Sequence, residues 1–218
     1  MSTQIEITNK IVNYLQETGY RRDNIVDALV SETKSLGNVS RMQIAPEQGQ
    51  LLQIIIKISK SKLCLEIGRF TGLSTLYMAR GLPSGGKVKT IDNSDEFLPI
   101  ALKHWKSAGL HNKIETVNGN ALEVMQNYID KNCIFDLIFI DADKNNYDNY
   151  YELSLKLVNS NGIIIIDNML WGGDVVLSSA NDEQTKNIRQ LNKKIQNDNR
   201  VQYSLLPLSD GISFVIKK

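Results

Sequence analysis

The sequence is poor in cysteine, because its 218 residues include only Cys64 and Cys133. Two thiols do not form a disulfide framework, and no paired cysteine and histidine spacing indicates a zinc site. Long hydrophobic runs are also missing, since stretches such as 163–166 are far too short to cross a bilayer. The N-terminal residues lack the basic stretch and apolar block that mark a signal peptide, so we expect a cytoplasmic protein with no membrane partner.

An excess of charge of either sign is absent as well, with 25 basic residues against 24 acidic ones and a net charge of +1. This balance gives the whole chain no attraction to nucleic acid or to an anionic membrane, although it says nothing about a local basic patch. The length suits one domain with a full core, and no internal repeat or low-complexity linker divides it. We therefore predict a single domain over residues 1–218.

Two parts of this domain differ in their sequence pattern. Residues 1–60 are predicted to form a helical cover of three helices: Gly19 ends the first, Asp23 caps the second and Pro46 begins the third. Residues 61–218 form the α/β core, where short apolar runs alternate with amphipathic stretches. We expect strands at 63–67, 87–91, 114–117, 135–140 and 163–166, and helices at about 72–81, 95–109, 121–129, 146–158 and after 181.

The fold class follows from the hydrophobic pattern of these strands. They are apolar on successive residues, which is typical of strands buried on both faces, and their alternation with helices predicts a parallel sheet between helical layers. Two final strands, at about 200–206 and 212–217, are joined by the short segment 207–211 and so form an antiparallel pair. We predict a three-layer, Rossmann-like α/β fold with a mostly parallel seven-stranded sheet and an antiparallel C-terminal strand.

A glycine-containing turn follows the first strand, where ligands bind in parallel sheets. In LEIGRFTGLS, Gly68 and Gly72 allow a tight turn and close approach of a ligand to the backbone. The spacing differs from the dinucleotide fingerprint, which argues against a nicotinamide-dependent oxidoreductase. Asp92 ends the next strand and can accept both hydroxyls of a ribose. The alternative is a tight connection that binds nothing.

Oxygen donors follow two strands that should be neighbours in the sheet. Asp141 follows the fourth strand, and Asp167 and Asn168 follow the fifth. Two carboxylates that close together repel each other unless a cation lies between them. Oxygen ligands suit a hard divalent ion, with Mg²⁺ as the first expectation and Ca²⁺ or Mn²⁺ as alternatives. The simpler alternative is that these residues cap turns and helices, where Asp and Asn are common.

Four motifs occur in a characteristic order and spacing: MQIAPEQGQLL, LEIGRFTGLS, FDLIFIDADKNNY and IIIIDNMLWGG. From about residue 40 to the C-terminus, the chain resembles the caffeoyl-CoA and catechol O-methyltransferase family of class I methyltransferases, in its bacterial form. The resemblance implies S-adenosylmethionine as the cofactor. The cofactor-binding residues that it implies are Glu66 and Gly68 at the methionine end, Ser74 at the methionine carboxylate, Asp92 at the ribose, Ala121 by the adenine, Met42 before the third helix, Asp143 near the amino group, and Asp141.

The resemblance also implies the reaction, which is methyl transfer to a hydroxyl of a catechol-like or phenolic small molecule. A phenolic hydroxyl has a pKa of about 10 and is a poor nucleophile, so a divalent metal at Asp141, Asp167 and Asn168 would favour its ionised form. Lys144 matches the lysine that takes the proton in the catechol branch of the family, and a nearby cation would disfavour its ammonium form. The alternative is that Lys144 is solvated or pairs with Asp143 or Asp148.

Candidate acceptor-pocket residues follow the metal motifs. Tyr147, Trp171 and the glycine pair after it are expected to shape this pocket, or else to pack on the rim of the sheet. Plant caffeoyl-CoA enzymes tend to carry asparagine just after this tryptophan, so Gly172 argues against a CoA ester. Arg69 departs from the small or β-branched residue usual in the family and is expected to reach a substrate carboxylate or to point to solvent.

Two further expectations concern partners. Some bacterial relatives of similar pattern methylate a hydroxylated uridine in tRNA, which is the alternative function, although the neutral charge argues against an RNA substrate. The resemblance favours a homodimer. The helices of residues 1–60 are expected to cover the cofactor cleft or to pair with a second subunit.

Overall fold

A computed structural model describes residues 5–218 of the chain. Its α-helices are α1 (Asn9–Thr18), α2 (Asn24–Lys34), α3 (Pro46–Ser59), α4 (Leu73–Gly81), α5 (Leu98–Ser107), α6 (Ala121–Asp130), α7 (Tyr147–Leu157) and α8 (Glu183–Gln196). Its strands are β1 (Leu63–Ile67), β2 (Lys87–Asp92), β3 (Ile114–Asn118), β4 (Phe135–Ile140), β5 (Val158–Ile166), β6 (Val201–Leu206) and β7 (Ile212–Lys217). Four short 3₁₀ turns are η1 (Gly37–Met42), η2 (His111–Lys113), η3 (Lys144–Asn146) and η4 (Trp171–Val176).

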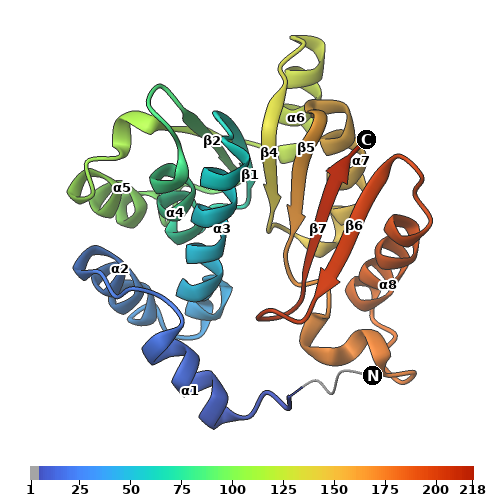
Figure 1. The fold of residues 1–218 in the computed structure, drawn as a ribbon, viewed down its shortest axis with the longest axis horizontal. Helices are drawn as coiled ribbons and strands as arrows, with labels where there is room; N and C mark the ends of the chain where they lie inside the picture. Colours follow the sequence, from blue (N-terminus) through green and yellow to red (C-terminus); the bar gives the residue numbers. More distant parts are fainter. Residues whose placement is uncertain (1–4) are drawn as a thin grey trace.

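The seven strands form one sheet in the order β3-β2-β1-β4-β5-β7-β6 (Figure 1). Strands β1 to β5 run parallel, and β7 runs antiparallel to both of its neighbours, β5 and β6. The order reverses at β1, because β2 lies on one side of it and β4 on the other. A reversal of this kind opens a crevice at the carboxyl ends of the strands, which is where ligands bind in such sheets.

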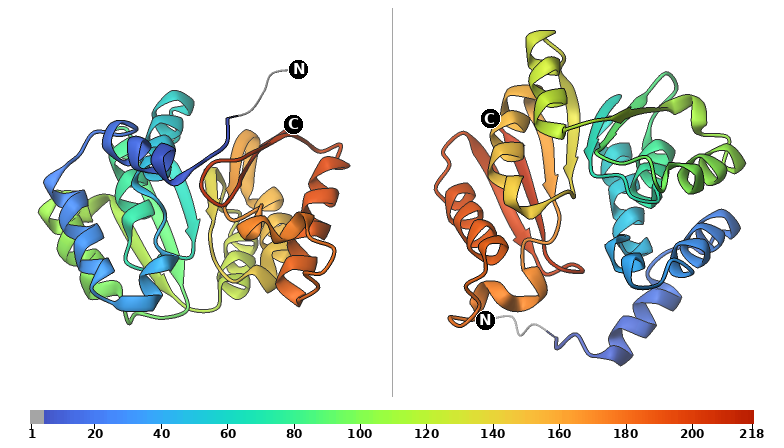
Figure 2. Two further views of the ribbon diagram at one scale, coloured as in Figure 1. Left: turned by 90° about the horizontal axis from the view of Figure 1, so that it is seen from below. Right: turned by 180° about the vertical axis from the view of Figure 1, so that it is seen from behind.

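Each face of the sheet carries its own hydrophobic cluster, so the domain has three layers. Leu65 and Ile138 face a cluster formed with α6, α7 and α8. Cys64 and Leu137, one position away on the same strands, face a cluster formed with α2, α3, α4 and α5. This alternation is the two-residue period of a strand covered on both faces. Figure 2 shows the two helical layers on opposite sides of the sheet.

The end of α1 and the starts of α2 and α3 lie at the predicted residues. Gly19 caps the end of α1, the side chain of Asp23 accepts hydrogen bonds from the first turn of α2, and Pro46 stands at the start of α3. Helices α2 and α3 bury Leu29 and Leu52 in the second cluster. Helix α1 buries none of its residues and projects from the body of the molecule (Figure 1).

The predicted fold class is confirmed, with β1 and β4 at their predicted bounds. Two features differ from the expectation. Strand β3 is largely exposed because it is the edge of the sheet, so it is not buried on both faces. Strand β5 begins at Val158 rather than at 163, so its polar first half continues directly from α7. Among residues 5–218, no helix is both long and apolar enough to span a membrane.

Candidate active site

The glycine turn after β1 is held by backbone contacts at the reversal of strand order. The Gly68 amide donates to the Ile91 carbonyl at 2.9 Å, and the Asp141 amide donates to the Ile67 carbonyl at 2.8 Å. Gly68 has a φ of +92°, and a Cβ at this position would lie 1.9 Å from the Asp141 carbonyl oxygen. Only glycine fits here, because both the backbone conformation and the contact exclude a side chain.

Asp92 supports this turn with its carboxylate. One oxygen accepts hydrogen bonds from the amides of Arg69 and Phe70 at 2.9 and 3.0 Å, and the other accepts from the Ser94 amide at 3.1 Å. The carboxylate is half-buried, so part of it remains accessible to a ligand. The predicted acid at the end of β2 is therefore an organiser of the turn as well as a candidate ribose ligand.

Glu66 is a fully buried carboxyl beneath the turn. Its Oε2 atom accepts hydrogen bonds from the hydroxyls of Thr75 and Thr90, and its Oε1 atom has no partner among residues 5–218. Burial raises the pKa of Glu66 to about 7, against the opposing effect of the hydroxyls of Ser74, Thr75 and Thr90. A buried acceptor without a partner beside a glycine turn fits the amino group of a ligand.

The other predicted cofactor residues lie around the same edge of the sheet. Ser74 is buried in the first turn of α4, and Ala121 opens α6 behind the capping side chain of Asn120. Met42 ends η1 with half of its surface exposed. Asp143 is exposed, and its carboxylate accepts from the Tyr150 hydroxyl at 2.6 Å. Their roles toward a cofactor stay predictions.

Arg69 does not point to solvent, so that expectation is wrong. Its side chain is fully buried and donates to the Asp95 carboxylate at 2.9 Å and to the Ser94 carbonyl at 3.0 Å. The guanidinium thus fastens the loop after β2 to the turn after β1. Contact with a substrate carboxylate, the other expectation, stays a prediction.

The ends of β4 and β5 place two carboxylates next to each other. Ile140 pairs with Ile166, so Asp141 and Asp167 leave neighbouring strands at the same level. Asp167 is 4% exposed, and its pKa is raised above the ordinary value by burial and by the nearby charge of Asp141. Asn168 follows in the left-handed region, at a φ of +57°, which asparagine tolerates better than most residues.

Lys144 lies against the first of these carboxylates. Its Nζ atom lies 3.2 Å from Asp141 Oδ1, 3.0 Å from the Ala142 carbonyl and 2.7 Å from the Tyr147 hydroxyl. The side chain is nearly buried, and its ammonium also faces the Trp171 ring at 5.8 Å from the centroid. The expectation of a solvated lysine, or of one paired with Asp143 or Asp148, is therefore wrong.

The predicted pocket residues lie on two sides of Lys144. Tyr147 is completely buried at the start of α7, and burial and the charges of Asp141 and Asp167 raise its pKa well above 10. Trp171 is half-buried at the start of η4, with a φ of +48°, and the two glycines after it also have positive φ. The structure thus brings Tyr147 and Trp171 together around one amine.

Several site residues were missed by sequence reasoning. The buried side-chain amide of Gln48 in α3 has no hydrogen-bond partner within residues 5–218, yet it lies close enough to Asp167 to lower the pKa of that carboxyl. Arg189 of α8 holds the segment after Trp171 by donating to four backbone carbonyls, those of Asp174, Val175, Leu177 and Ala180. Asp210 accepts from the side-chain amide of Asn168 at 3.1 Å. Only the first of these stood inside a recognised motif, MQIAPEQGQLL.

A second missed feature joins the helical cover to the glycine turn. The hydroxyls of Thr33 in α2 and Thr71 in the turn lie 2.9 Å apart. The Gln43 amide donates to both, at 2.8 and 3.0 Å. These side chains tie the segment around Met42 to the turn after β1.

Solved methyltransferase structures share this architecture. An O-methyltransferase from Bacillus cereus, crystallised in complex with SAH (S-adenosylhomocysteine), matches with a TM-score of 0.86 and 31% identity over 96% of this chain and 97% of that one. The seven-stranded sheet with its reversed strand β7 is thus a methyltransferase fold.

Sequence relatives narrow this class to a family. A protein named probable caffeoyl-CoA O-methyltransferase 2, from Dictyostelium discoideum, is 40% identical over 98% of this chain and 94% of its own length. The caffeoyl-CoA O-methyltransferase of Populus kitakamiensis is 33% identical over 92% of this chain and 90% of its own. The family model described as O-methyltransferase matches residues 16–218. The chain belongs to the O-methyltransferase family, as its motifs predicted.

Proposed function

We propose that this O-methyltransferase transfers a methyl group from S-adenosylmethionine to one hydroxyl of a catechol-like small molecule, assisted by a divalent cation. The observation that carries the proposal is the meeting of Asp141, Asp167 and Lys144 at the carboxyl ends of β4 and β5, in backbone contact with the glycine turn. The relatives named for caffeoyl-CoA support an aromatic acceptor. The Gly172 position argues for a free small molecule rather than a CoA ester.

The residues present fit the methyl donor. The unpartnered Oε1 atom of Glu66 offers a buried acceptor for an amino group, and the N-terminus of α4 near Ser74 favours a carboxylate. Asp92 offers carboxylate oxygens to ribose hydroxyls, while Met42, Ala121 and the region of Asp143 surround the same edge. The Bacillus cereus relative was crystallised with SAH, which is the donor without its methyl group, and this complex supports the assignment.

The residues also fit a divalent cation. Within residues 5–218, no three His, Cys, Asp or Glu side chains gather into a metal site, but the proposed set needs only two acids and the amide of Asn168. Burial first, and the charge of Asp141 second, raise the pKa of Asp167, and a cation between the two carboxylates would offset both effects. Oxygen donors of this kind suit Mg²⁺ first and Ca²⁺ or Mn²⁺ next.

The bound methyl donor and cation would supply part of the chemistry of methyl transfer, and side chains of the protein supply the rest. When bound, the donor supplies an electrophilic methyl group and the cation favours the ionised form of an acceptor hydroxyl. Lys144 Nζ, in its neutral form, takes the hydroxyl proton, and Asp141 holds the amine in place at 3.2 Å. Tyr147 fixes the amine from the other side, and Trp171 forms a wall for an aromatic ring. Orientation of the acceptor then accounts for several kcal/mol of barrier lowering.

A direct assay tests this proposal. Methyl transfer from labelled S-adenosylmethionine is measured on a panel of catechols, including 3,4-dihydroxycinnamate, with Mg²⁺ and then with EDTA. We expect transfer that needs the metal, is lost in Asp167→Ala and is retained in Asp130→Ala, which changes an exposed carboxylate at the end of α6. Intact binding of S-adenosylmethionine with no transfer to any catechol would contradict a catechol-like acceptor. Transfer to tRNA from a modification-deficient strain would then identify tRNA as the acceptor instead.

We also propose that residues 1–60 act as a cover for the donor site within a single domain, and that two copies form a homodimer. The hydrogen bonds of Gln43 to Thr33 and Thr71 support the cover.

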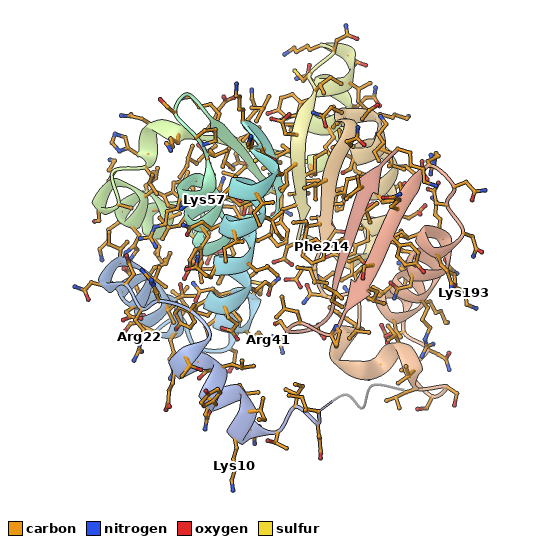
Figure 3. The ribbon with its side chains drawn as sticks, viewed as in Figure 1. Lys10, Arg22, Arg41, Lys57, Lys193 and Phe214 are labelled. Atoms are coloured by element: carbon orange, nitrogen blue, oxygen red, sulfur yellow. The ribbon has the colours of Figure 1, made fainter. Side chains whose placement is uncertain are left out.

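The support for the homodimer is an uncovered face of the sheet. Helix α8 lies behind β6 and β7, whereas the front of these strands carries no helix among residues 5–218 (Figure 1). Phe214 lies on this front face, between β7 and α3 (Figure 3), and the exposed Ile216 follows two residues later.

A further inference from the structure

We propose that Asp210 is a positioning residue with two roles. Its carboxylate holds the side-chain amide of Asn168 so that the amide oxygen stays free for the cation. The same carboxylate also fixes the start of the loop that begins at Trp171. This inference rests on the proposed function, because it deepens the metal site described above. Asp210 lies in the connection between β6 and β7, remote in sequence from Asn168. Its carboxylate has one oxygen for each of two donors.

The first donor is the side chain of Asn168. Its Nδ2 atom donates to Asp210 Oδ2 at 3.1 Å. An asparagine amide carries a donor arm and an acceptor arm, and only the oxygen can bind a cation. Since a carboxylate accepts but never donates, it can hold only the nitrogen arm. Asp210 therefore selects the amide orientation that leaves Oδ1 free, in the way that outer partners orient metal ligands.

The second donor is the backbone amide of Gly172, which donates to Asp210 Oδ1. Gly172 directly follows Trp171, where the backbone turns through two glycines with positive φ. The same carboxylate thus connects a cation ligand to the loop that walls the acceptor pocket.

Backbone contacts keep Asp210 in register with this segment. The Leu170 amide donates to the Asp210 carbonyl, and the Met169 amide donates to the Gly211 carbonyl, each at 2.9 Å. Gly211 has a φ of +86°, and a Cβ on it would lie 2.5 Å from the Leu170 amide nitrogen. The close approach of the two backbones needs glycine here, and it places the Asp210 side chain within reach of both donors.

The test compares wild type with Asp210→Ala and Asp210→Asn, with Asp130→Asn as a matched loss of an exposed carboxylate far from the site. The first readout is the NMR signal of the Asn168 side-chain amide in the metal-free protein, assigned by its loss in Asn168→Asp. The second is the Kd for Mn²⁺ alone, measured by electron paramagnetic resonance. The third is the KM for the acceptor at saturating metal.

We expect Asp210→Ala to move the Asn168 amide signal to the position of an exposed asparagine and to raise the Mn²⁺ Kd by about 10–100-fold. Asp210→Asn should give values between those of wild type and Asp210→Ala, because its single amide oxygen can accept well from only one of the two donors, Asn168 or Gly172. It also serves as the variant of choice if the alanine protein fails to fold. The acceptor KM should rise in both, and Asp130→Asn should match wild type throughout.

Two outcomes would overturn the role of Asp210. One is an unchanged Asn168 amide signal in Asp210→Ala. The other is an equal loss of Mn²⁺ affinity in the alanine and asparagine variants, because charge alone would then account for the effect. If wild type binds no Mn²⁺, the proposed metal function fails, and the metal-free amide signal still decides whether Asp210 orients Asn168.

Discussion

The Nζ atom of Lys144 donates a hydrogen bond to the Tyr147 hydroxyl oxygen at 2.7 Å and lies 3.2 Å from a carboxylate oxygen of Asp141. One amine thereby connects a buried aromatic wall to a candidate metal ligand. The contacts fix its position with little help from solvent, because the Lys144 side chain is 11% exposed. The proposed general base is therefore already held in place before an acceptor molecule binds.

Replacing Lys144 with methionine should lower kcat by about 10²–10⁴-fold, since the substitution roughly keeps the length of the side chain and removes the proposed general base. The Kd for S-adenosylmethionine should stay within about twofold, because the glycine turn is untouched. Steady-state kinetics and calorimetry measure the two quantities. Tyr147→Phe is the matched control, expected to lose much less activity because it removes only a hydrogen-bond partner. A Lys144→Met enzyme with nearly full kcat would show that another group takes the proton.

Asp167→Asn should separate stability from function. The substitution removes a buried carboxylate that lies beside the charge of Asp141, so the metal-free protein should gain roughly 1–2 kcal/mol of unfolding free energy. The same change removes a charged oxygen donor, so Mg²⁺-dependent methyl transfer should be lost. Thermal unfolding in EDTA and the labelled-methyl assay test the two effects. A less stable metal-free variant would contradict the repulsion that we infer between Asp141 and Asp167.

Glu66 should make the stability of the ligand-free protein depend on pH. Its pKa is raised from 4.5 to about 7, so the folded state holds a proton that the unfolded state has released between these values. Stability therefore falls as pH rises through this interval, by at most about 3 kcal/mol, and no further loss from this group follows above it. Glu66→Gln should remove that dependence and be more stable than wild type at pH 8. Urea unfolding at pH 5 and pH 8 measures both, with the exposed Glu123→Gln as the control.

Arg189→Met should loosen the loop after Trp171. The guanidinium donates to four backbone carbonyls in 174–180, and methionine keeps the stem while removing every donor. We expect faster amide exchange in this segment and a severalfold rise in the acceptor KM, with the Kd of S-adenosylmethionine unchanged. Hydrogen exchange by mass spectrometry and steady-state kinetics provide the readouts. Unchanged amide exchange in residues 174–180 would show that this loop stays ordered without the hydrogen bonds of Arg189.

Ile216→Glu should dissociate the proposed homodimer, because it places a charge on the front face of β7 that no helix covers in residues 5–218. The mass in solution, measured by light scattering after gel filtration, should fall from that of two chains to that of one. Lys217→Glu, on the alternate face of the same strand, is the comparison. A wild-type protein that is already monomeric would refute the dimer itself.

Much of the fold was predictable because the signals were local. Buried strands read as continuous apolar runs, Asp23 capped its helix as expected, and Gly68 marked the turn that no other residue could form. The carboxyl ends of the strands then located Asp141 and Asp167. These inferences need only strand periodicity and the rule that ligands bind where the strand order reverses.

The missed residues act through contacts across long stretches of sequence. Asp210 meets Asn168 from 42 positions away, and Arg189 reaches carbonyl groups that carry no side-chain signal. The solvent-facing alternative for Arg69 was wrong because its partner, Asp95, lies in a loop whose path no local pattern fixes. Which side chain a buried donor meets depends on packing, and a single sequence does not display packing.

The contact between Gly68 and Asp141 bears on how such an enzyme can change its acceptor over evolutionary time. The glycine turn and Asp141, the proposed metal ligand, are joined through backbone atoms, at a distance where no Cβ fits. The spacing between methyl donor and reacting oxygen is therefore insulated from most mutations. Residues of the loop that begins at Trp171 can diversify to admit differently shaped acceptors, while the geometry of transfer is inherited unchanged.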